Sequence, residues 1–202
     1  MLKSIAAFSI ATAAMTAAAL ALPEIGDKAP AFTGVTSSGK TISLDQFKGK
    51  PVVLEWTNDG CPFVQKQYGS GAMQKAQSAV QKGGGVWISV ISSAPGKQGY
   101  ADAARANQLS AERDATPDYV LLDPSGEIGR HYAAKTTPHM FVIDQAGMLR
   151  YDGAIDDQPT TKHTEPAGIK TYALDAFNRV VKHEPVEISQ TQPYGCSVKY
   201  GS

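Results

Sequence analysis

Two short apolar runs with a helical segment between them constrain the fold of this chain more than any other feature. Residues 52–56 (VVLEW) and 86–91 (VWISVI) are rich in β-branched side chains, as buried strands are. Between them, apolar side chains recur at helical spacing from position 63 to position 80, and Gly69 and Gly71 predict a kink or a break there. A strand, a helix and a strand at this spacing predict a right-handed βαβ unit.

The segments around this unit complete an α/β pattern. A third strand is expected, followed by two strands that a short turn joins into an antiparallel hairpin. Two further helices and two short extended segments are also expected. The predicted strands lie at 119–122, 140–143 and 149–155, the helices at 99–113 and from 164 to 181, and the extended segments at 31–36 and 41–47. Their order predicts a three-layer α/β sandwich with a mixed central sheet.

The N-terminal residues 1–21 have the pattern of a signal peptide. Lys3 gives a short basic start, residues 5–20 are apolar or small, and Ala19-Leu20-Ala21 supplies the small-x-small pattern of a cleavage site. A retained membrane anchor is the alternative, but the run is alanine-rich and no stop-transfer charges follow it. A lipoprotein would have a cysteine at the cleavage site, and this sequence has none there. We therefore expect a soluble periplasmic protein.

The rest of the chain is long enough for one domain with a proper core, which we place at residues 22–184, followed by a polar tail at 185–202. The formal net charge of the whole chain is +0. A neutral chain without a basic cluster gives no support to nucleic-acid binding or to binding at a membrane surface.

The first of two cysteines, Cys61, lies where the first buried strand leads into the helix. Backbone N–H groups and the dipole of a helix N-terminus favour a thiolate there, and Pro62 suits a first helical turn. With a pKa of about 8.5 only ~3% of a thiol is ionised at pH 7, and with a pKa of about 6 the fraction is ~90%. An inert buried thiol is the alternative. The end of a parallel strand, however, favours a catalytic cysteine.

The second cysteine, Cys196, lies in the tail sequence PYGCSVKY. In an exported protein two cysteines most simply pair with each other, which requires the tail to return until the Cα atoms are within about 7 Å. The pair could be a structural staple worth up to ~5 kcal/mol. We favour a catalytic pair, in which Cys196 on a flexible tail resolves an oxidised Cys61. A Cys-x-x-Cys motif would have its second cysteine at position 64, where this chain has Val64. The substitution is compatible with redox chemistry if Cys196 supplies the second thiol.

Three segments carry a resemblance to a known family. The sequence WTNDGCP after the first strand, TTPHMFVID before the hairpin, and the N-terminal AFTGVTSSGKTISLDQFKGKPVVLEW resemble the redoxin branch of the thioredoxin fold. This branch contains the alkyl hydroperoxide reductases and peroxiredoxins and their periplasmic thiol–disulfide relatives, and the resemblance covers residues 25–184. It implies a thioredoxin-like sandwich with an N-terminal redoxin extension. The ending QTQPYGCSVKY is similar to the tail of a peroxiredoxin-like subgroup with a late second cysteine.

The resemblance also implies roles for residues near Cys61. It implies a cis peptide bond between Thr137 and Pro138, with the preceding backbone docking substrate like an added strand. Two positions depart from the peroxiredoxin pattern. Asn58 stands where the family has a threonine, with Thr57 one place earlier, and Pro138 stands where it has an arginine. Those family residues hydrogen-bond the peroxide and the thiolate. The chain therefore lies between the peroxiredoxin and thioredoxin branches.

The expected site combines the two catalytic cysteines with supporting residues. Those supporting residues are Trp56, Thr57, Asn58, Pro62, Thr137 and Pro138. We expect no cofactor beyond the redox-active cysteines and no metal, because the four histidines are scattered. His139 could contact a substrate. Arg130 and Arg150, and the pair Asp156-Asp157, are interpreted as solvated surface residues.

Three functions are open at this point. The first is a thiol-dependent peroxidase, in which Cys61 attacks a peroxide, Cys196 resolves the product, and a thiol donor of the cell envelope reduces the disulfide. The second is a thiol–disulfide oxidoreductase acting on protein disulfides. The third is a non-enzymatic binding module with a structural disulfide.

Overall fold

The computed structural model describes residues 22–163 and 168–201. The expected signal peptide at 1–21 lies outside these residues, as does Thr164-Glu165-Pro166, the expected start of the last helix. Within the described part of the chain, no helix has the length and the apolar character needed to cross a membrane.

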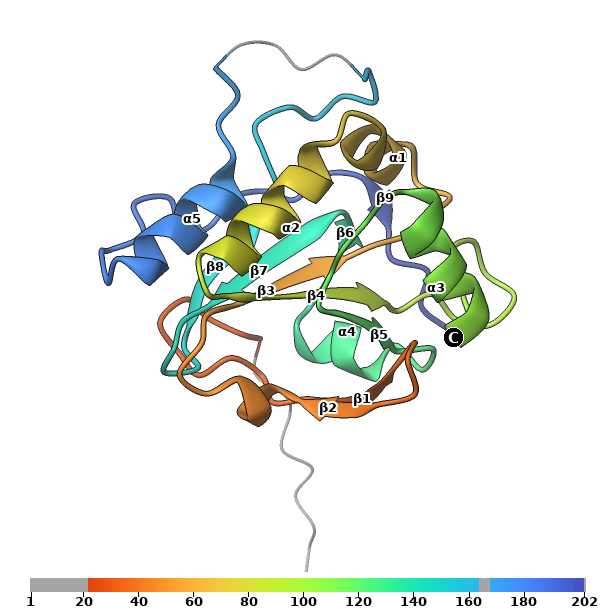
Figure 1. Ribbon diagram of the computed structural model, residues 1–202, viewed down its shortest axis with the longest axis horizontal. Coiled ribbons are helices and arrows are strands. Elements are labelled where there is room, and N and C mark those ends of the chain that lie inside the picture. The colour runs from red at the N-terminus through yellow and green to blue at the C-terminus, as the bar shows by residue number, and fades with distance from the viewer. Residues whose placement is uncertain (1–21, 164–167, 202) are drawn as a thin grey trace, which may run out of the picture.

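Seven strands form one mixed sheet in the order β2-β1-β5-β4-β3-β7-β8 (Figure 1). The central strands β3, β4 and β5 run parallel, whereas β7 pairs with β3, and β1 with β5, in the antiparallel direction. The parallel β3–β4 pair confirms the predicted βαβ unit, and the β7–β8 hairpin is confirmed as antiparallel. The strands are β1 (Thr33–Thr36), β2 (Thr41–Ser43), β3 (Val52–Trp56), β4 (Val86–Ile91), β5 (Tyr119–Leu122), β7 (His139–Ile143) and β8 (Leu149–Gly153).

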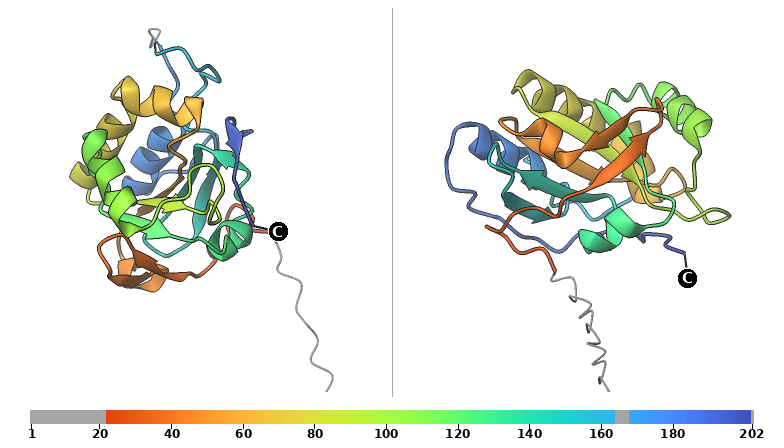
Figure 2. Two further views of the ribbon diagram at one scale, coloured as in Figure 1. Left: turned by 90° about the vertical axis from the view of Figure 1, so that its right-hand side faces the viewer. Right: turned by 90° about the horizontal axis from the view of Figure 1, so that it is seen from below.

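Helices cover both faces of this sheet, which confirms the predicted three-layer sandwich. Helices α2 and α5 lie on one face and α4 lies on the other (Figures 1 and 2), and α3 packs along β5. The helices are α1 (Pro62–Gly69), α2 (Ala72–Lys82), α3 (Ala103–Glu112), α4 (Glu127–His131) and α5 (Tyr172–Val181), with a 3-10 turn at Leu44–Phe47.

Strand β3 shows why the sheet has a core on each side. Its side chains alternate between the faces, as the pleat of a strand requires. Leu54 and Trp56 belong to the hydrophobic cluster on the face of the sheet that α4 covers. Val53 belongs to the cluster on the other face, which contains Cys61 and Phe177 of α5. A strand buried on both faces is mostly apolar, and VVLEW fits this pattern apart from Glu55, which is buried as well.

Several element boundaries differ from the prediction for local reasons. The expected helix at 99–113 begins only after Asp102, whose carboxylate accepts a hydrogen bond from the Arg105 backbone N–H at 2.8 Å. The break at Gly69 and Gly71 is confirmed, since α1 ends at Gly69 and Gly71 has a φ of 78°. Helix α4 was not predicted, because five residues are too few for a recurring apolar pattern.

The tail folds back onto the domain instead of extending away from it. Strand β9 (Cys196–Ser197) pairs in the antiparallel direction with β6 (Thr136–Thr137). The Val198 N–H donates to the Lys135 carbonyl at 3.0 Å, and the Tyr200 hydroxyl donates to the Ala134 carbonyl at 2.8 Å. The chain end accordingly lies against the body of the protein in Figure 2. A freely flexible tail, as expected from its polar sequence, is therefore not what the structure shows.

Candidate active site

The turn after β3 places Cys61 at the N-terminus of α1. The side chain of Asn58 shapes this turn, because its Oδ1 accepts a hydrogen bond from the Gly60 N–H at 2.9 Å. The Asn58 carbonyl accepts another from the Cys61 N–H at 3.1 Å. Cys61 is the N-cap residue of α1, and Pro62 occupies the first helical position as predicted. The Cys61 side chain is 0% exposed.

The second wall of the site is the backbone before Pro138. The peptide bond between Thr137 and Pro138 is cis, which confirms the prediction. The protonated Cys61 thiol donates a hydrogen bond to the Thr137 carbonyl at 3.0 Å. Thr137 is almost fully buried, so this segment and the start of α1 enclose the sulfur from two sides.

Strand β9 supplies the third wall and brings the second cysteine to the first. Cys196 is paired with Thr137, whose hydroxyl donates to the Cys196 carbonyl at 3.4 Å. Cys196 packs against the buried cluster that contains Cys61 and lies close enough to lower the pKa of the Cys61 thiol, and both cysteines are free thiols. Gly195 permits this approach, because a Cβ on it would lie 2.0 Å from the Thr137 oxygen.

The pKa values of the two thiols are shifted in opposite directions. Burial raises the pKa of Cys61, but hydrogen bonds from the Cys196 thiol and from the Val64 backbone N–H outweigh it, so the pKa lies below its ordinary value. The Val64 contribution is the helix N-terminus effect expected from the sequence. Burial and the interaction with Cys61 raise the pKa of Cys196 to about 11. Cys61 is thus the more acidic thiol of the pair, and Cys196 is the thiol that stays protonated and can stabilise a Cys61 thiolate.

This arrangement has the chemistry of a cysteine pair that can be oxidised reversibly. A thiolate is the nucleophilic form of cysteine, and a second thiol in contact with it can displace whatever group oxidation leaves on the first. A Cys-x-x-Cys motif places both thiols on one helix turn. Here the pairing of β9 with β6 brings the second thiol to Cys61 instead. The position of the second cysteine of such a motif is held by Val64, which is buried in the core.

A model of the AhpC/TSA family matches residues 25–152, well over half of the chain. The chain belongs to the AhpC/TSA family. The match ends before Cys196, so the second thiol of this AhpC/TSA protein lies outside the matched segment.

Individual relatives agree with the redoxin assignment. The chain is 28% identical over 134 residues to the protein named Peroxiredoxin Q, chloroplastic, of Triticum aestivum, a match covering 62% of this chain and 57% of that protein. An uncharacterized conserved protein from Geobacillus kaustophilus has the same fold, with a TM-score of 0.78, 20% identity, and coverage of 88% of this chain and 93% of that one. A thioredoxin domain of the thiol-disulfide oxidoreductase BVU-2223 from Bacteroides vulgatus gives a TM-score of 0.51 at 23% identity, with coverage of 64% and 87%. The fold is thioredoxin-like, and the comparisons support a redox role in general.

The structure separates one predicted supporting residue from the pair of cysteines. Trp56 is fully buried in the other core cluster, where its indole N–H donates to Ser92 Oγ at 3.0 Å and its ring packs on Tyr132 and Phe141. Since successive side chains of a strand alternate, Trp56 faces away from Cys61. Thr57 is buried beside Glu55 at the start of the turn.

The basic and imidazole side chains considered from the sequence also make contacts elsewhere. Arg130 donates to the Gly201 carbonyl at 2.8 Å, and Arg150 pairs with Asp144 at 2.6 Å. His139 is buried, with its Nε2 at 2.6 Å from Asp152 Oδ1. None of these contacts reaches Cys61, and within the described residues no three His, Cys, Asp or Glu side chains gather as a metal site requires.

Asp156 is the residue that the sequence interpretation placed wrongly. It was expected to be a solvated turn residue, yet it is only 5% exposed. Gln67 Nε2 donates to its Oδ2 at 2.7 Å, Lys66 Nζ lies 3.5 Å from the same oxygen, and the Tyr194 hydroxyl donates to its Oδ1. The residue pattern Asp-Asp after a hairpin gives no sign of burial, because the partners come from α1 and from the tail.

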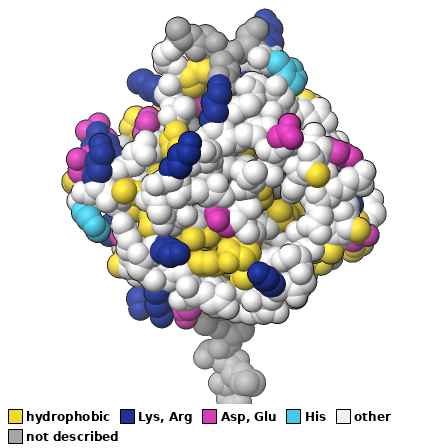
Figure 3. Space-filling model, viewed as in Figure 1, with side chains coloured by type: hydrophobic (Ala, Val, Ile, Leu, Met, Phe, Trp, Pro, Cys, Tyr) yellow, Lys and Arg dark blue, Asp and Glu magenta, His cyan; other side chains and the backbone are white. Residues whose placement is uncertain are grey.

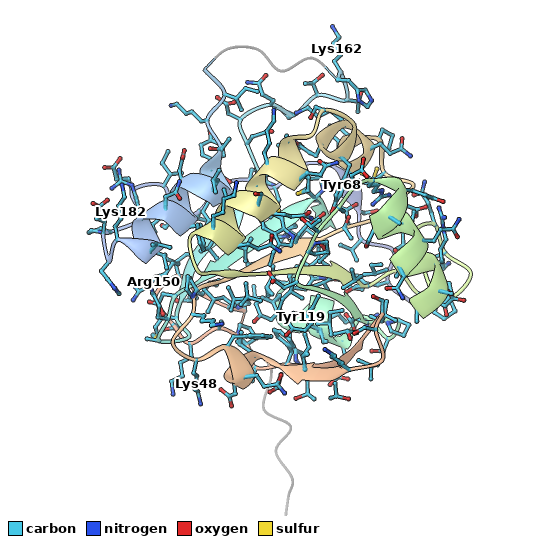
Figure 4. All side chains as sticks on the ribbon, in the orientation of Figure 1. Lys48, Tyr68, Tyr119, Arg150, Lys162 and Lys182 are labelled. Atoms are coloured by element: carbon cyan, nitrogen blue, oxygen red, sulfur yellow. The ribbon has the colours of Figure 1, made fainter. Side chains whose placement is uncertain are left out.

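A second buried acid lies below the turn. Glu55 Oε2 accepts hydrogen bonds from Ser89 Oγ at 2.7 Å and from Trp87 Nε1 at 3.0 Å, and the Tyr68 hydroxyl lies 3.0 Å from both carboxylate oxygens. Burial raises the pKa of Glu55 despite these bonds. Tyr68, labelled in Figure 4, belongs to α1, and Glu55 belongs to β3. Their hydrogen bond therefore ties the helix that carries Cys61 to the sheet. Charged side chains of both signs are interspersed on the face shown in Figure 3, in keeping with the net charge.

Proposed function

We propose that the protein is a thiol-dependent peroxidase of the cell envelope, in which Cys61 attacks a hydroperoxide and Cys196 resolves the product. The observation that carries the proposal is the β6–β9 pairing, which sets Cys196 beside a Cys61 of lowered pKa. Two thiols held together in this way can complete an oxidation within one chain.

The chemistry balances with one peroxide and two thiols. The Cys61 thiolate attacks one peroxide oxygen, the O–O bond breaks, and the other oxygen leaves as hydroxide or an alkoxide. The leaving group then takes up the proton that the Cys61 thiol released, which gives water or an alcohol. Cys61 is then a sulfenic acid. The Cys196 sulfur attacks it, water leaves, and a disulfide forms. An external thiol donor returns both cysteines to the reduced state with two electrons.

Occupation of the edge at Thr136–Thr137 favours a small oxidant over a protein client. In a strand-docking mode a client peptide would pair with this edge. Here β9 of the same chain already does so. A hydroperoxide needs only an opening of its own small size to reach the buried sulfur, whereas a client peptide would have to replace β9 along the whole edge of β6.

The cell-envelope location is supported by the sequence of residues 1–21 alone. An oxidising compartment is compatible with a cysteine pair that cycles through a disulfide. We therefore propose removal of the signal peptide, a soluble periplasmic protein, and a thiol donor in the same compartment as its reducing partner.

The deciding experiment compares the reduced protein, expressed as residues 22–202, with its Cys61→Ser variant in consumption of hydrogen peroxide. The unmodified protein should consume one equivalent in a single turnover and form a disulfide. Cys196→Ser should also consume peroxide at first but should stop at the sulfenic acid, which a dimedone adduct at Cys61 would reveal. Equal rates for the unmodified protein and Cys61→Ser would exclude the peroxidase.

One observation favours a second function, a thiol–disulfide oxidoreductase. Asn58 and Pro138 replace two family residues that bind peroxide, and Asn58 uses its side chain to shape the turn and to donate to the Gln98 carbonyl at 3.3 Å. Cys196→Ser would then trap a mixed disulfide between Cys61 and a client protein. Capture of the electron donor alone would support the peroxidase.

A further inference from the structure

The contacts of Tyr194 hold the tail just before Cys196. The Tyr194 hydroxyl donates to Asp156 Oδ1, Gln67 Nε2 lies 3.2 Å from that hydroxyl, and the Tyr194 ring packs on Phe63 with centroids 5.7 Å apart. Burial and the neighbouring Asp156 raise the pKa of Tyr194, so the phenol stays protonated and able to donate. A neutral donor on a buried carboxylate makes one of the stronger hydrogen bonds in proteins.

The acceptor of this hydrogen bond is itself held rigidly. Asp156 receives the side-chain amide of Gln67 and the ammonium of Lys66, both from α1, and the Gln67 and Lys66 side chains are 0% and 1% exposed. Helix α1 also carries Cys61 at its N-terminus. The contact therefore joins the helix of one cysteine to the strand of the other.

We propose that Asp156 and Tyr194 form a latch, a pair of positioning residues that keeps Cys196 against Cys61 and controls access to Cys61. The assignment of Cys196 as the resolving thiol rests on the function proposed above, but the latch itself rests on these contacts. The hydrogen bonds that join these two side chains to their neighbours do not involve either cysteine sulfur. They act through the position of β9.

The dimensions of β9 explain why a latch is needed. The strand has two residues and pairs only with the two residues of β6, so its own hydrogen bonds are few. Tyr194 precedes Cys196 by a single intervening residue, Gly195, and displacement of the ring must shift the cysteine. On the other side, Tyr200 and Val198 hold the end of the tail independently.

The burial of Cys61 gives the latch a second consequence. Because Cys61 is 0% exposed, an oxidant or an alkylating reagent reaches its sulfur only when the wall formed by the tail moves. A closed latch thus speeds disulfide formation with Cys196 and slows attack from solvent. An open latch does the reverse, and the two rates should change in opposite directions.

The test is Tyr194→Phe, which removes the hydroxyl and keeps the ring on Phe63. Access is measured as the rate of Cys61 alkylation by iodoacetamide in a Cys196→Ala background. Closure is measured as the rate of disulfide formation at saturating diamide in the protein that keeps both cysteines. Under this condition the rate is set by attack of one thiol on the diamide adduct of the other, and not by the access of diamide to Cys61. Diamide takes two electrons and two protons from the two thiols and becomes the hydrazine. The matched control is Tyr119→Phe, a tyrosine of β5 whose ring packs on Phe47 with centroids 5.5 Å apart.

Loss of one hydrogen bond to a buried carboxylate should raise alkylation by about tenfold and slow disulfide formation by a similar factor. Tyr119→Phe should change neither rate. Gln67→Met, which removes the amide from the α1 side, should act in the same direction as Tyr194→Phe and provides a second variant if that one does not fold. Rates for both variants within about twofold of the Tyr119→Phe control would overturn the latch. Neither readout uses peroxide, so failure of the peroxidase and failure of the latch are distinguishable.

Discussion

Cys196 lies directly opposite Thr137 in the β6–β9 pair, and the Thr137 carbonyl is also the acceptor, at 3.0 Å, for the Cys61 thiol. One residue of β6 is thus in contact with both cysteines. Because β9 and β6 belong to the same chain, a disulfide between Cys61 and Cys196 can form within one molecule. The first consequence concerns acidity, since the Cys196 thiol contributes the largest lowering of the Cys61 pKa.

Replacement of Cys196 by Ala should raise the pKa of Cys61, because the thiolate loses its strongest stabilising hydrogen bond. The measurement is the rate of Cys61 alkylation against pH, whose midpoint reports the thiol pKa. The midpoint should move to higher pH in Cys196→Ala. Cys196→Ser, which keeps a hydroxyl donor, should move it less. A midpoint that stays in place or falls would show that Cys196 does not stabilise the thiolate.

The reduction of the disulfide should begin at Cys196. Exchange is faster when the displaced sulfur has the lower pKa, and here that sulfur is Cys61. Cys196 is also partly exposed, whereas Cys61 is buried. Glutathione added to the oxidised protein, followed by acid quenching and peptide mass spectrometry, should therefore place the mixed disulfide on Cys196. Adducts found mainly on Cys61 would contradict this order.

The sheet could be predicted because its signals are local. Runs such as VVLEW at Val52–Trp56 are apolar apart from Glu55 and are buried on both faces, and a short turn between two strands leaves little freedom in how they pair. The position of Cys61 at the start of α1 follows from the same local pattern, since Pro62 marks the first turn. These features depend on neighbouring residues only.

The contacts of the tail could not be predicted, because they join residues distant in the sequence. Nothing in QTQPYGCSVKY shows that Cys196 pairs with Thr137, or that Tyr194 donates to Asp156. Trp56 stood close to Cys61 in sequence and was expected near it, but alternation along β3 directs it to the opposite face. Side-chain direction and distant pairing are therefore what the structure adds to the site.

Glu55 should make stability depend on pH in a defined direction. Burial raises its pKa in the folded protein above the ordinary value of 4.5. Between the unfolded and folded pKa values the folded state binds the extra proton, so its stability falls as pH rises through that window. Glu55→Gln removes this titration. The free energy of unfolding of the unmodified protein, minus that of Glu55→Gln, should decrease as pH rises above 4.5.

Urea unfolding at a series of pH values measures this difference, and Glu24→Gln, at an exposed position, serves as the control for loss of a carboxylate. The Glu24→Gln difference should vary little over the same range. A Glu55 difference that is flat or increases with pH would mean that the buried carboxylate has no raised pKa.

Asp156→Ala should destabilise the fold far more than Asp157→Ala, although the two acids are adjacent. Removal of Asp156 leaves Lys66, which is 1% exposed, without the carboxylate 3.5 Å away, and also leaves Gln67 and Tyr194 without their acceptor. Breaking a buried ion pair from one side typically costs roughly 3–5 kcal/mol, because an uncompensated charge remains. Among the described residues, the Asp157 side chain accepts peripheral hydrogen bonds from Gln158 and from the Lys170 N–H.

Urea unfolding of both variants at neutral pH provides the comparison. A loss for Asp156→Ala no greater than for Asp157→Ala would show that Lys66 reaches water when its partner is removed. Replacing Lys66 by Met together with Asp156→Ala should recover part of the stability, because the buried charge is then absent. If the double variant regains stability but still forms the Cys61–Cys196 disulfide slowly, the structural role of Asp156 is separate from its role in positioning Cys196.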